Sequence, residues 1–216
     1  MAKIKQGILG GFSGKVASLV GTSWKGRAVM KSLPLSVANP RTESQVGQRN
    51  KFSKIAELAS KILTQFVQPV ENPISGNISG YNLFCKDNKQ AFTDAGEFVG
   101  SRLVCGGGKI ANLDDIAASG SEASEEFVLT WDNPVGISAI RLTDKVYAVV
   151  LDESGNPIAV SSGETTRAAE TLTIDLTEGA EMPSAGDTVG VLYACVSADG
   201  RDVSVKTATI GAEVTA

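Results

Sequence analysis

The 216-residue sequence contains no histidine. This absence excludes histidine-based acid–base catalysis, Ser–His and Cys–His nucleophiles, and the commonest metal ligand. No other nucleophile, carboxylate pair or ligand cluster has a spacing that suggests an active site. We therefore expect a protein that is not an enzyme and that uses no cofactor and no metal.

Cysteine and long apolar runs are also scarce. Cys85, Cys105 and Cys195 are odd in number and far apart, and none belongs to a CxxC pair. This spacing predicts neither a disulfide framework nor a zinc site, but reduced cysteines in a chain that folds in a reducing cytoplasm. No apolar run reaches the roughly 18 residues of a membrane span, so we expect no membrane contact. Glycines and Lys15 interrupt the apolar residues near the N-terminus, which argues against a signal peptide.

The charge is unevenly distributed along the chain. Residues 1–61 carry 11 Lys and Arg against Glu43 and Glu57, a net charge of +9, whereas residues 121–216 carry 5 basic and 16 acidic residues, a net charge of −11. A basic N-terminal third suits nucleic acid or an acidic protein surface. The alternative is complementary packing between the two halves or between subunits. The aromatic residues among the basic ones are few, and no known nucleic-acid module fits.

The stretch at residues 39–67 predicts the main helix. Thr42 and Gln45 form a T-x-x-Q capping box after Pro40, while Pro69 and Pro73 mark the end. Apolar residues then recur with helical spacing, at Phe52, Ile55, Leu58, Ala59, Ile62, Leu63 and Phe66. This stripe has two interpretations, a core face or an oligomer seam. The seam is considered because neighbouring segments offer few large apolar residues to cover the stripe.

The rest of the N-terminal region predicts small elements. Two strand-like stretches, residues 14–21 and 24–33, are separated by a turn at Gly21–Ser23, which indicates a β-hairpin. A second helix at Tyr81–Phe92 would pair with the main helix as a helical hairpin. Gly106–Gly108 and Lys109 resemble a phosphate-binding loop, but Ile110 follows the lysine where the motif needs Ser or Thr, so we expect a flexible turn.

The acidic C-terminal half has the pattern of an all-β domain. The small, polar residues 117–124 predict a linker, and therefore a boundary between a docking region at 1–120 and a sandwich at 121–216. Strand patterns follow at residues 127–131, 145–151, 158–161, 170–176, 188–196 and 203–210. Short strands at this spacing, one of them with a buried-type Trp131, are typical of an immunoglobulin- or fibronectin-like β-sandwich. The expected fold class is α+β: an N-terminal β-hairpin and helical hairpin, followed by that sandwich.

Several motifs support a family resemblance that covers nearly the whole chain. They are Trp24-Lys25-Gly26, the run from Asn39 to Thr42 with Gln45, Gln48, Arg49 and Phe52, the Gly80–Asn82 run with Phe84, and Thr130-Trp131 with Thr143–Tyr147. Together they resemble a family of uncharacterised proteins encoded in bacterial genomes, phages and prophages. Glu43 stands where that family often has proline, and glutamate also suits a first helical turn. The resemblance implies no catalytic residue and a phage-linked context.

Three functional hypotheses follow. The first is a virion structural protein, such as a capsid decoration, head fibre or tail component, that is made in the host cytoplasm and docks by its N-terminal region. Its partners would be other virion proteins and copies of itself, as a trimer or closed ring rather than a filament. The second is a nucleic-acid-binding accessory protein, and the third is an adhesion or carbohydrate-binding module. The candidate docking and oligomerisation residues are Trp24, Arg41, Arg49, Phe52, Ile55, Leu58, Ile62 and Phe66.

Overall fold

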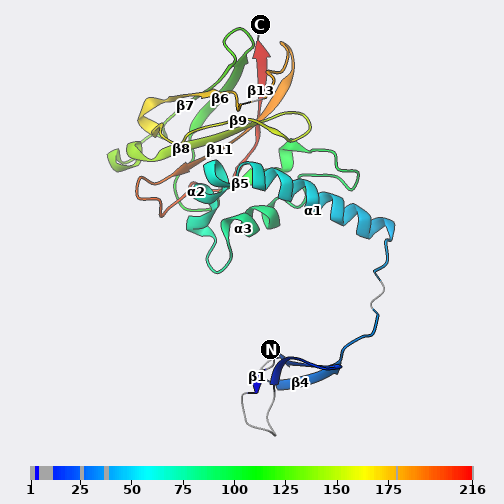
Figure 1. Ribbon diagram of the computed structural model, residues 1–216. Helices are drawn as coiled ribbons and strands as arrows, with labels where there is room; N and C mark the ends of the chain where they lie inside the picture. Colours follow the sequence, from blue (N-terminus) through cyan, green and yellow to red (C-terminus); the bar gives the residue numbers. More distant parts are fainter. Residues whose placement is uncertain (1–2, 5–11, 25–26, 37–38, 179, 216) are drawn as a thin grey trace. The chain divides into compact units, whose positions relative to one another are not determined.

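The computed structural model describes residues 3–4, 12–24, 27–36, 39–178 and 180–215 (Figure 1). The chain divides into two compact units, Met1–Arg41 and Thr42–Ala216. The α-helices are α1 (Glu43–Lys61), α2 (Gln68–Glu71) and α3 (Gly80–Asp87). Shorter helical turns are Leu63–Val67 (π-helical), Asn72–Ile74, Gly100–Arg102, Ala139–Thr143 and Arg167–Ala169 (all 3-10). The strands are β1 (Lys3–Ile4), β2 (Phe12–Val16), β3 (Leu19–Trp24), β4 (Arg27–Ser32), β5 (Val104–Cys105), β6 (Asp114–Ser121), β7 (Glu126–Asp132), β8 (Lys145–Leu151), β9 (Pro157–Val160), β10 (Thr171–Asp175), β11 (Thr188–Val196), β12 (Thr207–Ala208) and β13 (Ile210–Thr215).

The first unit is an antiparallel sheet in the order β1-β2-β3-β4. The sequence predicted a hairpin here but misplaced its turn. Val16 pairs with Leu19, so the tight turn is Ala17–Ser18, and Gly21–Ser23 lie inside β3. Ala17 has a φ of 50°, the left-handed backbone conformation that tight hairpin turns use.

The main helix begins where the sequence predicted, but it ends differently. Thr42 is the N-cap with an extended backbone, although its side chain makes no capping hydrogen bond, so the predicted capping box is wrong. The helical path continues past Lys61 through the π-helical turn into α2, where Pro69 occupies the first turn. Pro69 has no amide to donate, and it lies where the path changes from the π-helical to the α-helical form, directly after Gln68, whose amide donates to the Leu63 carbonyl. The second helix is shorter than predicted, and the Ser79 hydroxyl accepts a hydrogen bond from the Asn82 amide at its start.

The second unit is built on a seven-stranded sheet in the order β10-β7-β6-β13-β11-β8-β9. Neighbouring strands are antiparallel except β6 and β13, which are parallel. A bridge between Ala159, at β9, and Leu176, just after β10, brings the two outer strands together, so the sheet is nearly closed into a barrel. The predicted mixed α+β class is confirmed.

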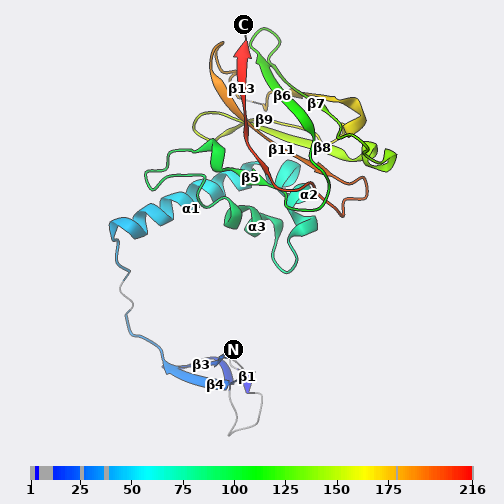
Figure 2. The same ribbon diagram turned by 180° about the vertical axis from the view of Figure 1, so that it is seen from behind.

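Strands β8 and β11 are buried on both faces, which explains how the helices and the sheet share one unit. Alternate residues such as Val150 and Val191 point into the barrel, which is filled from Phe127, Leu129 and other strand residues. The intervening residues, such as Val149 and Leu192, belong to a second core with the helices. Figures 1 and 2 show α1, α2 and α3 lying together on this outer side of β8 and β11.

The predicted boundary at residues 120 and 121 falls inside β6. Residues 117–121, expected to be a linker, pair with β7 on one side and, near the end of the strand, with β13 on the other. Most side chains of β6 are exposed or only partly buried, so small polar residues suit this strand. Composition alone does not distinguish such a strand from a linker. The division between compact units lies instead after Arg41.

Candidate docking surfaces

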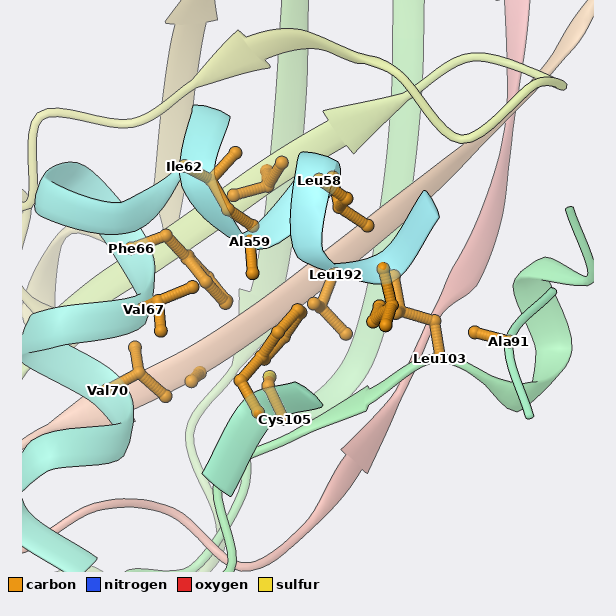
Figure 3. Packing of buried hydrophobic residues seen from close by; sticks show 14 of the residues in the cluster. Leu58, Ala59, Ile62, Phe66, Val67, Val70, Ala91, Leu103, Cys105 and Leu192 are labelled. Carbon is orange, nitrogen blue, oxygen red and sulfur yellow. The ribbon is translucent and has the colours of Figure 1, made fainter. Parts of the chain in front are cut away.

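The large apolar residues of the predicted seam lie in the core. Ile55, Leu58, Ile62 and Phe66 are at most 2% exposed. Figure 3 shows Leu58, Ile62 and Phe66 gathered with Leu192 of β11, and these residues belong to one core cluster. Their cover comes partly from strand residues far along the chain, such as Leu192, and partly from residues of and after α3, such as Phe84 and Leu103. These four residues therefore offer no docking surface on the folded chain.

Phe52 and Arg49 lie on the exposed part of α1. Phe52 is 60% exposed, and with Gln48, Arg49, Ser53 and Ala56 it lines a shallow hollow. An exposed phenylalanine beside an arginine suits protein contact, since aromatic residues and arginine are enriched in interfaces. This hollow is one candidate surface.

The two remaining predicted residues belong to the first unit. Arg41 is exposed and is the last residue of that unit. Trp24 ends β3, where it is opposite Arg27. The side chain of Trp24 lies outside the described residues, so its predicted role in docking stays a prediction.

The register of the first unit separates its charged side chains from its apolar ones. Residues directly opposite each other in an antiparallel sheet share a face. The pairs between β2, β3 and β4 therefore define an uncharged face, with Gly14, Val16, Leu19, Gly21, Ser23, Ala28, Met30 and Ser32. The opposite, lysine face carries Ser13, Lys15, Val20, Thr22, Val29 and Lys31.

Both faces of this sheet leave large apolar side chains in solvent. On the uncharged face Val16, Leu19 and Met30 are 50%, 45% and 64% exposed, and on the lysine face Val29 is 40% exposed. A small sheet is normally stable only when a hydrophobic face packs against another layer. Residues 1–41 also contain seven Lys and Arg and no Asp or Glu. The first unit is therefore a basic sheet whose apolar side chains lack cover within the described part of the unit.

The glycine-rich loop at 106–108 is unsuited to phosphate. The Gly106 amide donates to the Glu71 Oε1 at 3.0 Å, and the Gly107 and Gly108 amides both donate to the Ser204 carbonyl. A phosphate loop needs free backbone amides. A Cβ on Gly108 would lie 2.2 Å from the Val203 carbonyl oxygen, so the glycine is needed for close packing. The sequence predicted a flexible turn here. The structure has a turn whose three glycine amides are all hydrogen-bonded.

Glu71 is a buried carboxyl that the sequence did not single out. Glu71 is only 2% exposed, and this burial is the main reason that the pKa of its carboxyl rises to about 7. The hydrogen bond from Gly106 lowers the pKa, while the neighbouring Asp87 raises it. Glu71 connects α2 to the glycine-rich loop, which gives it a structural role.

Arg167 connects the segment before β6 to the segment after β7. It is fully buried, and its guanidinium donates to the carbonyls of Ala111 and Asn112 at 2.8 and 2.9 Å. The Arg167 carbonyl accepts from the Trp131 indole at 3.1 Å. A buried charge is normally retained only when such partners satisfy it. No pattern in the sequence distinguished Arg167 from the exposed arginines.

A polar cleft of about 500 Å³ lies between α2 and the ends of β8 and β11. Lys145, Tyr147 and Asp199 are among its lining residues. The Ser197 hydroxyl and the Arg201 amide donate to Asp199, and the former is the main reason that its pKa lies below the usual range. An acid held in its ionised form is a poor proton donor, so Asp199 is unsuited to act as a general acid at neutral pH.

The three cysteines lie in the interior of the larger unit. Cys85, Cys105 and Cys195 are free and buried, and burial raises the pKa of each thiol. Among the described residues, no group of His, Cys, Asp and Glu is placed to hold a metal ion. In the same part of the chain, every helix is too short or too polar to cross a membrane.

The family match covers both units. The sequence pattern of the family of unknown function DUF6266 matches residues 11–210. The chain belongs to this family. The match confirms the expected membership of an uncharacterised family over nearly the whole chain, and places the basic sheet and the larger unit in one family pattern. No curated protein and no solved structure matches the chain.

Proposed function

We propose that this protein is a non-enzymatic structural component of a phage particle, such as a capsid decoration, head fibre or tail component. Residues 1–41 dock onto the particle, and residues 42–216 are displayed from it. The single observation that carries this proposal is the basic first unit: it has seven Lys and Arg and no acidic residue, and its lysine face also leaves Val29 exposed. Such a unit gains stability by packing on a partner, and its charge favours an acidic one.

The segment that joins the units supports docking by one and display by the other. Ser32 ends β4 and Glu43 begins α1, and the described residues between them form no helix or strand. Pro34 and Pro40 favour an extended backbone at the residues that precede them, Leu33 and Asn39. A unit on such a segment reaches a neighbouring surface without rearranging the larger unit.

For the larger unit we propose the finer fold of a fibronectin- or immunoglobulin-like domain, and its strand order supports this proposal. In chain order β6, β7, β8, β9, β10, β11 and β13 correspond to strands A, B, C, C′, E, F and G. The order β10-β7-β6 then gives E-B-A, and β13-β11-β8-β9 gives G-F-C-C′, as in such domains. The parallel β6–β13 pair joins the two groups. Domains of this class commonly serve as modules on surfaces, which agrees with display.

Mass spectrometry of purified particles tests the proposal. The particles are purified through two density gradients, and the chain is quantified against the major head protein. We expect a constant ratio in both gradients, because a structural component has a fixed number of positions. Absence of the chain from intact particles, or a ratio that falls with each purification step, would contradict the proposal.

Nucleic-acid binding is the second candidate function, favoured by the same net charge of residues 1–41. Lys15 and Lys31 flank Val20 on one face of the sheet, where they would reach phosphates. Binding to duplex DNA would then weaken steeply with salt. In a plot of the logarithm of the association constant against the logarithm of the salt concentration, each phosphate contacted would add roughly −0.9 to the slope. Submicromolar DNA affinity of the full chain, lost in residues 42–216, would favour this function over particle docking.

A further inference from the structure

The uncharged face of the first unit is distinct from the lysine face on which particle docking would rely. Val16 and Leu19 are directly opposite each other, and Met30 is opposite Gly21, which has no side chain. The three large apolar residues are 45–64% exposed. The other residues of this face whose side chains the structure describes are Gly, Ala and Ser. The result is a flat surface of small residues around an apolar centre.

We infer that the uncharged face packs against the same face of a second copy of this chain. Across the paired residues of β2, β3 and β4, two such faces meet without a charged side chain between them, because Lys15 and Lys31 lie on the opposite face. Nucleic acid or an acidic protein surface would be attracted to the lysine face instead. The uncharged face fits a partner that is also flat and uncharged, and a second copy supplies one.

The distances between layers make this pairing compatible with the basic charge of the unit. Facing sheets pack about 10 Å apart, and the lysines project from the outer sides of both sheets. The two lysine layers are then separated by more than the Debye length of about 8 Å at physiological salt, so their repulsion is largely screened. The two lysine faces remain available to a particle.

The small residues favour close contact, but the size of the face limits affinity. Gly14, Gly21 and Ala28 allow backbones to approach, while the unbranched Met30 adapts to an irregular gap. The pairing is two-fold, with the same patch used by both copies. Stable interfaces usually bury at least about 1,200 Å², and a face of three short strands buries less. We therefore expect a concentration-dependent dimer with a dissociation constant in the micromolar range or weaker.

Light scattering on the full chain, without particles, tests this inference. Between roughly 1 and 100 μM the mass should rise from 22.4 kDa toward twice that value. Met30→Lys should weaken the dimer at least about tenfold, because the new charge would be buried in the pairing. Val29→Lys is the matched control: it is the next residue of β4, on the lysine face, and should leave the dimer intact. A monomer at 100 μM, a larger assembly, or equal effects of the two variants would overturn the inference.

Cross-linking separates loss of pairing from loss of folding. Met30→Cys is a mild change, and the native cysteines are buried, so a short bis-maleimide reagent would act mainly at residue 30. We expect covalent dimers from Met30→Cys and few from Val29→Cys. Equal yields from the two variants, or none from Met30→Cys, would contradict the inference. Because particles are absent, failure here leaves the docking proposal intact, and failure of docking leaves the dimer intact.

Discussion

Gly47 shows how one residue joins α1 to the rest of its unit. It is buried, and a Cβ at this position would lie 2.9 Å from the Cβ of Asp94. Lys51, one turn later, forms a salt bridge with Asp94 at 2.9 Å. Gly47 therefore lets the start of α1 approach the loop that contains Asp94, although glycine is a poor helix former.

Gly47→Ala should lower stability despite the better helix propensity of alanine. The gain in propensity is about 1 kcal/mol, whereas an overpacked contact typically costs about 1–3 kcal/mol, so we expect a net loss. Chemical denaturation measures the change. Ser53→Ala, on the exposed part of the same helix, is the control and should be neutral or slightly stabilising. If Gly47→Ala is more stable than the wild type, the close contact with Asp94 costs less free energy than the gain in helix propensity.

Glu71 predicts a pH-dependent term in stability. Its pKa rises from 4.5 to about 7 in the folded chain, mainly because of burial. Between these values the folded state binds more protons than the unfolded state, so this contribution decreases as pH rises through the window. Glu71→Gln keeps an oxygen acceptor for Gly106 and removes the titration. We expect thermal denaturation to show that this variant is more stable than the wild type at pH 8, by up to about 3 kcal/mol, and similar at pH 4.5.

A matched variant controls for a general effect of removing negative charge. Glu57→Gln changes an exposed carboxylate whose pKa is lowered, chiefly by a hydrogen bond from Lys61. It should leave the difference in stability between pH 5 and pH 8 unchanged. If Glu71→Gln shows the same pH dependence as the wild type, Glu71 does not titrate in this range.

At the scale of elements, the helical path from α1 into α2 has one buried and one exposed phenylalanine. Phe66 is fully buried against the sheet, and Phe52 is 60% exposed. Phe66→Ala should destabilise the chain by about 3–5 kcal/mol, because it leaves a cavity in the core. Phe52→Ala should change stability by less than about 0.5 kcal/mol. Chemical denaturation compares the pair, and similar losses would mean that the two faces have been assigned incorrectly.

The sequence predicted elements better than it predicted their partners. Strands such as β8 and β11 have the predicted bounds because their apolar and β-branched runs are long. The helical stripe was also recognised, but one of its two interpretations, the seam, required it to stay uncovered. The covering residue Leu192 lies far along the chain, and periodicity gives no information about such distant contacts. For the same reason the sequence did not assign the faces of β2–β4, which depend on register and on the position of the Ala17–Ser18 turn.

At the scale of the whole molecule, the helices and the sheet should fold together. The outer sides of β8 and β11 pack against the helices through residues such as Val149, Leu192 and Val196. Residues 42–216 should therefore unfold in one cooperative transition, with about the same midpoint as this unit has in the full chain. Residues 121–216 should aggregate or remain unfolded, because the outer face of β8 and β11 would be exposed and most of β6 would be missing.

Thermal denaturation followed by circular dichroism, with light scattering for aggregation, compares these fragments. Cooperative unfolding of a monomeric 121–216 fragment would contradict the shared core. It would instead support the boundary near residue 120.

The central claim is that residues 1–41 dock the chain onto a phage particle, and sedimentation with purified particles tests it most directly. Particles lacking the chain are mixed at physiological salt with either the full chain or residues 42–216, then pelleted, and the bound copies are counted. The full chain should pellet at a saturating, constant number of copies per particle, while residues 42–216 should stay in the supernatant. Equal binding of the two, or no binding of the full chain, would contradict the claim.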